Sequence, residues 1–124
     1  MTLTRDANLT IIERMKREQE FARLMLSEAA AMLLNGEPDV SLGILNLLVQ
    51  ATVGLEELAE LTSTPLDRIS HLLSSNGNPD MNLLAAIFKI LNMYLCVDIH
   101  VRSVDAGSEQ DEFEPSIQTR PDAA

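Results

Sequence analysis

Hydrophobic residues recur at helical spacing through the first part of the chain. No Gly or Pro interrupts the pattern from about Leu9 to Leu34, so the sequence predicts one long N-terminal helix. Gly36 can end this helix in the left-handed conformation, and Pro38 suits the first turn of a second helix, expected over Asp39 to Ala51. The apolar stripe of the long helix comprises Leu9, Ile12, Met15, Ala22, Leu26, Ala29, Ala30 and Leu33.

Two short helices joined by a tight turn are predicted between Gly54 and Pro79. Thr64 is a good N-cap for the second of them, and Pro65 suits its first helical position. A link as short as Thr62 to Thr64 makes the helices cross at a steep angle, as in a helix-turn-helix. Their apolar faces comprise Leu55, Leu58, Ala59 and Leu61 in the first helix, and Leu66, Ile69, Leu72 and Leu73 in the second.

The last regular elements are a helix over Met81 to Leu95 and an alternating segment from Cys96 to Arg102. Alternation with a period of two predicts a half-buried strand. A single strand cannot form a sheet, so it must pair with a second subunit or with a partner protein. Asp98, His100 and Arg102 share one face of this strand, and the dimer-forming or partner-binding face comprises Val97, Ile99 and Val101.

A family resemblance runs through the helix pair and its flanks. The matching residues are Leu58-Ala59, Ile69, Leu72, the exit Ser74 to Pro79, Ser27 to Ala30, Asn35 to Pro38, Leu83 to Leu91 and Val97 to Ile99. With these residues the chain resembles Cro/repressor-type helix-turn-helix proteins. More narrowly, it resembles addiction-module antidote (antitoxin) proteins and related transcriptional regulators. The likeness covers roughly residues 20 to 102.

The resemblance implies a lambda-repressor-like bundle that binds double-stranded operator DNA without catalysis. In a helix-turn-helix the N-terminal part of the second helix meets base edges in the major groove. Arg68 would then donate to guanine or to a phosphate, although an ordinary polar surface is the alternative. The candidate DNA-binding residues are Thr64, Pro65, Asp67, Arg68, Ser70, His71 and Ser74.

Electrostatics oppose strong DNA binding, because affinity depends largely on Lys and Arg at the phosphates. The chain has a formal charge of −10, and Arg68 is the only Lys or Arg between Ser41 and Asp80, against five carboxylates. Two interpretations of the basic residues in the N-terminal helix stay open: an arm that contacts phosphates or a partner, or a solvated face with i,i+4 ion pairs. These residues are Arg14, Lys16, Arg17 and Arg23.

A second hypothesis follows from the same charge. The chain would be a protein-binding module that has lost or weakened operator binding and neutralises a basic toxin. Its acidic surface, and the strand Cys96 to Arg102, would contact that toxin.

Enzymatic chemistry is not expected, because the sequence has no activated nucleophile motif, no Gly-rich phosphate loop and no metal-ligand spacing. We therefore expect no cofactor and no metal. The lone Cys96 is expected to be a small buried hydrophobe, and it leaves no intrachain disulfide. A cytoplasmic protein that makes no membrane contact is the corresponding prediction.

The predicted fold is mainly α: a helix-turn-helix bundle with a long N-terminal helix and one short C-terminal strand. Aromatic residues make up only 3% of the chain, so its core must be aliphatic. The predicted domain organisation has three parts. Residues 1–36 are an N-terminal helical extension, residues 37–103 are the helix-turn-helix domain with the strand, and residues 104–124 are an acidic disordered tail.

Overall fold

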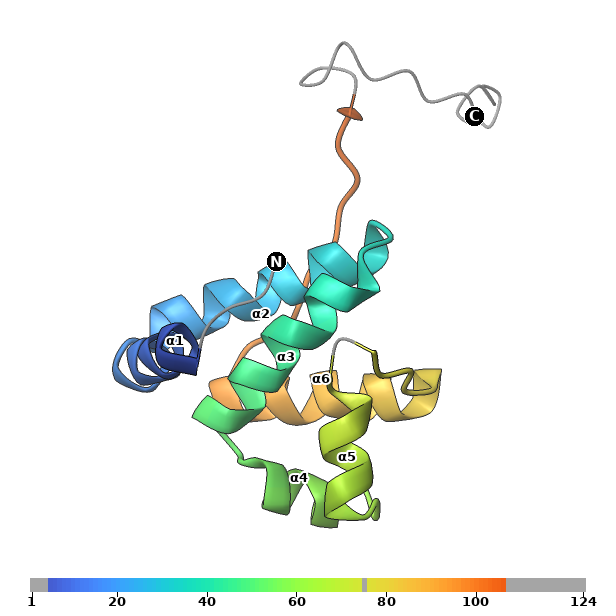
Figure 1. The fold of residues 1–124 in the computed structure, drawn as a ribbon. Coiled ribbons are helices and arrows are strands. Elements are labelled where there is room, and N and C mark those ends of the chain that lie inside the picture. Colours follow the sequence, from blue (N-terminus) through green and yellow to red (C-terminus); the bar gives the residue numbers. More distant parts are fainter. Residues whose placement is uncertain (1–4, 75, 107–124) are drawn as a thin grey trace.

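Six helices make up most of the part of the chain that the structure describes (Figure 1). The structure, a computed structural model, describes residues 5–74 and 76–106. No strand occurs among these residues, so the prediction of a mainly α fold is confirmed. The helices are α1 (Arg5–Arg17), α2 (Gln19–Leu34), α3 (Pro38–Ala51), α4 (Leu55–Leu61), α5 (Leu66–Leu72) and α6 (Met81–Leu95).

The core forms around α3, which runs through the middle of the molecule and packs most extensively on α2 (Figure 1). As expected from the sequence, the core is aliphatic, and Leu45 and Leu48 of α3 are fully buried in it. Ser41 is also fully buried, and its hydroxyl donates a 2.8 Å hydrogen bond to the carbonyl of Ala29. This bond satisfies the buried hydroxyl and joins α3 to α2.

The predicted single N-terminal helix is wrong, because the chain breaks at Glu18 into α1 and α2. Glu18 has an extended backbone (φ −120°, ψ 99°). Its N–H still bonds to the carbonyl of Arg14, whereas its own carbonyl accepts from Phe21 and Ala22 at the start of α2. The break folds α1 back onto α3, so that Ile12 enters the shared core. A straight helix of this length would extend beyond that core.

The ends of α2 and α3 follow the predicted turn chemistry. Gly36 has φ +89° and closes α2, and Pro38 occupies the first turn of α3. At the other end of α3, Gly54 also has φ +89°, and α4 leaves at an angle of 101° to α3. Within the described residues no single helix is long and apolar enough to span a membrane; α3 and α4 meet that test only together, as a bent pair.

The segment after α6 differs from its prediction. Cys96 is exposed rather than buried, and it closes α6 with a left-handed backbone (φ +57°). Residues 97–105 then form neither a strand nor a helix, so the predicted strand has no pairing partner among the described residues. Val97 and Ile99 pack partly against the core, but Val101 is 66% exposed. The predicted alternation of buried and exposed side chains therefore holds at Val97 and Ile99 but not at Val101. Strand pairing stays a prediction.

The predicted acidic tail lies almost wholly outside the described residues, since only residues 104–106 of it are described. The proposed division at residue 36 also stays a prediction. In the structure the apolar residues of α1 and α2 share one core with those of α3 to α6.

Candidate nucleic-acid interface

The turn between α4 and α5 is a Schellman motif, the helix end in which two backbone N–H groups reach back to the last turn. The N–H of Thr64 bonds to the carbonyl of Ala59 at 2.9 Å, and the N–H of Ser63 bonds to that of Glu60 at 3.2 Å. Ser63 has φ +53°, the left-handed conformation that glycine adopts most easily. Ser63 therefore keeps the turn geometry that a glycine would give, at a cost in strain.

The predicted cap of α5 is wrong by one residue. Thr64 makes no side-chain bond to the helix; its hydroxyl donates instead to the carbonyl of Thr62 at 3.1 Å. Pro65 takes the N-cap position, and the helix begins at Leu66. The proline ring fixes φ at −59° there, with ψ at 147°, so the backbone turns sharply into α5 without a side-chain cap.

Two buried residues fix the orientation of α5. Ile69 and Leu73 are fully buried, and they pack in the same core as Leu58 and Ala59 of α4. The prediction that Leu66 and Leu72 also face inward is only partly right: Leu66 is 43% exposed, and Leu72 is half-buried. Because α5 has only two full turns, the narrow stripe from Ile69 to Leu73 is sufficient to anchor it.

The candidate DNA-binding residues lie as a group on the outer side of α5. Ser74 is half-buried, and its hydroxyl donates a 2.7 Å hydrogen bond to the carbonyl of His71; Thr64 is half-buried in the turn. The other candidates are exposed: Pro65, Asp67, Arg68, Ser70 and His71.

A shallow groove of about 400 Å³ lies beside this face, between α5 and the start of α6. Arg68 lines it together with Asn78 and Asn82, two exposed amides that were not predicted from the sequence. Asp80 also lines it, but its carboxylate accepts a 2.8 Å bond from the N–H of Leu83 and so caps α6. The groove therefore offers one guanidinium and two amides as donors.

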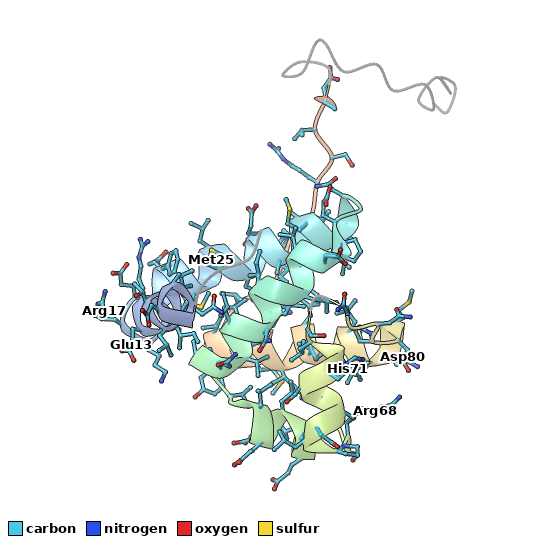
Figure 2. All side chains as sticks on the ribbon, viewed as in Figure 1. Glu13, Arg17, Met25, Arg68, His71 and Asp80 are labelled. Carbon is cyan, nitrogen blue, oxygen red and sulfur yellow. The ribbon has the colours of Figure 1, made fainter. Side chains whose placement is uncertain are left out.

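Arg68 has no ion-pair or hydrogen-bond partner among the described residues. Figure 2 shows Arg68, His71 and Asp80 on one side of the molecule, and Glu13 and Arg17 on the opposite side. An unpaired, exposed guanidinium is available for a phosphate or a guanine edge.

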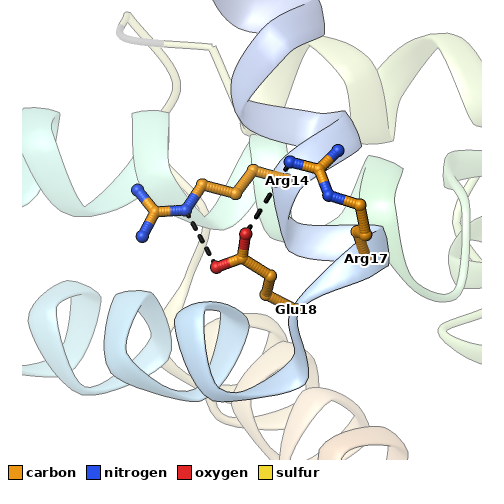
Figure 3. A network of polar contacts seen from close by, with 3 residues as sticks. All are labelled: Arg14, Arg17 and Glu18. Carbon is orange, nitrogen blue, oxygen red and sulfur yellow. Dashed lines mark hydrogen bonds and ion pairs between the residues drawn. The ribbon is translucent and has the colours of Figure 1, made fainter.

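The basic residues of the N-terminal region serve mostly in the protein's own structure. Arg14 Nε bonds to Glu18 Oε1 at 3.1 Å, and Arg17 Nη2 lies 3.7 Å from Glu18 Oε2 (Figure 3). The Arg14 guanidinium also lies 3.9 Å from the centre of the Phe21 ring. Of the two interpretations left open by the sequence, these contacts favour intramolecular ion pairs over a phosphate arm.

Arg23 has a separate structural role. Its Nε donates a 3.0 Å hydrogen bond to the carbonyl of Leu95, one of the last carbonyls of α6 that have no partner within that helix. Gln19 reaches the same carbonyl at 3.5 Å. Of the four basic residues, Lys16 alone has no partner among the described residues, and it lies on α1, away from α5 (Figure 1).

No family model, curated protein or solved structure matches this chain. In the described part of the chain, no three His, Cys, Asp or Glu side chains come together in a group that could hold a metal ion.

Proposed function

We propose that this chain is a non-catalytic, DNA-binding transcriptional regulator of the addiction-module antidote type. The α4–α5 pair would be its helix-turn-helix, with α5 in the major groove of a double-stranded operator. One observation supports this most directly. The left-handed turn at Ser63 and the buried anchors Ile69 and Leu73 hold α5 so that its polar side, with the unpaired Arg68, faces solvent.

Binding would depend on few phosphate contacts. Each protomer brings Arg68 of α5, which has no partner among the described residues, so a dimer brings two such arginines. Asn78 and Asn82 add neutral donors from the adjoining groove. Counterion release gives a slope of roughly −0.9 in log K against log salt for each neutralised phosphate. We therefore expect a slope near −2 and modest affinity at physiological salt.

A toxin-neutralising module is the second candidate, and the outer face of α4 supports it. Glu56, Glu57 and Glu60 are all exposed, and none has an ion pair within the described residues. A cluster of unpaired carboxylates suits a basic protein partner and repels DNA. Both functions are compatible in one chain, because α4 and the outer side of α5 are different surfaces. A cytoplasmic location belongs to the same proposal.

Selection from a random duplex pool at low salt, using the purified protein, tests DNA binding without assuming any operator sequence. We expect enrichment of a two-fold symmetric sequence. In fluorescence anisotropy, the enriched duplex should bind more tightly than a scrambled one. If the pool shows no enrichment and neither duplex binds at low salt, the isolated protein does not bind DNA. The toxin-neutralising candidate then replaces the first.

A further inference from the structure

The chain after α6 presents an open backbone edge beside an exposed apolar surface. The backbone N–H and C=O groups of residues 98–104 form no hydrogen bond with any described residue. Val101 and Val104 are 66% and 68% exposed, and they line a groove of about 490 Å³ with Leu34 of α2, itself 63% exposed. Polar residues such as Ser27, Asn35 and Arg102 line the groove as well. An unpaired backbone edge beside exposed apolar side chains is a template for strand pairing.

Charge indicates that the occupant is a second copy of this chain. Asp98 and Arg102 lie two positions on either side of His100, are both exposed, and have no ion pair among the described residues. They are four residues apart on an extended chain, about 13 Å, so they cannot pair within one copy. Two copies in antiparallel register can pair both of them.

We propose that residues 97–103 of two copies pair as antiparallel strands about a two-fold axis at His100. In this register residue i faces residue 200 − i of the other copy. Asp98 then faces Arg102 of the second copy, and Ile99 faces Val101, each pair occurring twice in the dimer. The apolar side chains stay on the face that Val97 and Ile99 already turn toward the core.

Neighbouring registers lose this complementarity. An axis at residue 99 would place Asp98 opposite His100 and leave Arg102 opposite Cys96. An axis at residue 101 would place Arg102 opposite His100 and Asp98 opposite the apolar Val104. Opposite charges directly across an antiparallel pair are stabilising, and mismatched ones are not. The Asp98–Arg102 charge pairing therefore selects the axis at His100.

The inference rests on the dimer of the proposed regulator but not on its DNA binding, so its tests use no DNA. In a Cys96→Ser background, His100→Cys places two thiols at the axis. Facing Cα atoms there lie about 4.5–5.5 Å apart, within the range for a disulfide. The matched controls are Asp98→Cys and Arg102→Cys, whose like residues would lie about 14 Å apart.

Mild oxidation followed by a non-reducing gel should convert the His100→Cys protein to a covalent dimer and leave both controls as monomers. Faster cross-linking of either control would overturn the register. Sedimentation equilibrium of the unmodified chain should give twice the mass of 13.7 kDa. A monomer at tens of micromolar would overturn the dimer itself, whatever the outcome of the DNA selection.

Charge exchange supplies a test that needs no cysteine. Asp98→Arg and Arg102→Asp should each raise the dimer dissociation constant by about tenfold, because each places like charges opposite one another at two positions. The double variant should restore the constant to near that of the parent, and all three should keep the parent's helical circular dichroism. Additive weakening in the double variant would contradict the pairing.

Discussion

Arg23 offers the sharpest test of whether the N-terminal basic residues belong to the fold or to a DNA interface. Arg23→Ala removes the 3.0 Å bond to the carbonyl of Leu95 and a positive charge at the C-terminus of α6. A hydrogen bond to a charged group contributes about 1.5–3 kcal/mol, and a cation at a helix C-terminus about 0.3–1 kcal/mol. The side chain is 35% exposed, and Gln19 still reaches the same carbonyl. With that discount we expect a loss of about 1–2 kcal/mol in the free energy of unfolding.

Urea denaturation followed by circular dichroism measures this loss. The matched control is Arg17→Ala, since the Arg17 side chain is 67% exposed and contacts Glu18 only at 3.7 Å. An exposed ion pair of this kind contributes under about 0.5 kcal/mol. Equal stability of the two variants would refute the capping role of Arg23. A larger loss of DNA affinity in Arg23→Ala than in Arg68→Ala would restore the phosphate-arm hypothesis.

Further predictions concern two glycines and the turn residue Ser63, and all are measured by the same urea titration. Gly77→Ala should destabilise by about 1–3 kcal/mol, because the new Cβ would lie 2.8 Å from the carbonyl oxygen of His71 and closer still to the backbone of Leu72. Gly43→Ala, with nothing within 4 Å on helix α3, should instead stabilise by roughly 0.5–1 kcal/mol, and the same sign for both glycines would contradict this account. Ser63→Gly should stabilise by up to about 1 kcal/mol by relieving the left-handed strain, whereas a loss would mean that the Ser63 side chain stabilises the turn.

Helix ends could be predicted from the sequence where a glycine or a proline determines the local backbone conformation. Met81 and Leu95 bound α6 as predicted, and Gly36 and Pro38 end α2 and begin α3 as expected. The break at Glu18 had no such signal, since neither Gly nor Pro is near. Its only trace is a five-residue stretch without apolar residues, from Lys16 to Glu20.

The segment after α6 also differs from its prediction. Cys96 was expected in a strand, but the chain must leave α6 by a left-handed residue before it can extend. A strand pairs with a second strand, and no periodicity in one chain reveals its partner.

The sequence predicts which side of α5 is exposed, because the buried residues set it. It does not predict which side chains from other elements reach the site. The spacing of Ile69 and Leu73 fixes which side of α5 faces solvent, and the exposed candidates follow from that. Asn78 and Asn82 were missed because they reach the groove from a different element, the turn into α6 and its first helical turn. Likewise, only the folded chain shows that Arg23 reaches Leu95, 72 residues away in sequence.

The salt dependence of operator binding in Arg68→Ala tests the proposed function most directly. Fluorescence anisotropy on the selected duplex, at several salt concentrations, should show weaker binding. If both Arg68 side chains of a dimer contact phosphate, the slope should become less negative by roughly two. Lys16→Ala, on α1 and therefore away from α5 (Figure 1), should leave affinity and slope unchanged. If Arg68→Ala left DNA affinity and salt slope unchanged while Lys16→Ala weakened DNA binding, DNA binding through α5 would be contradicted.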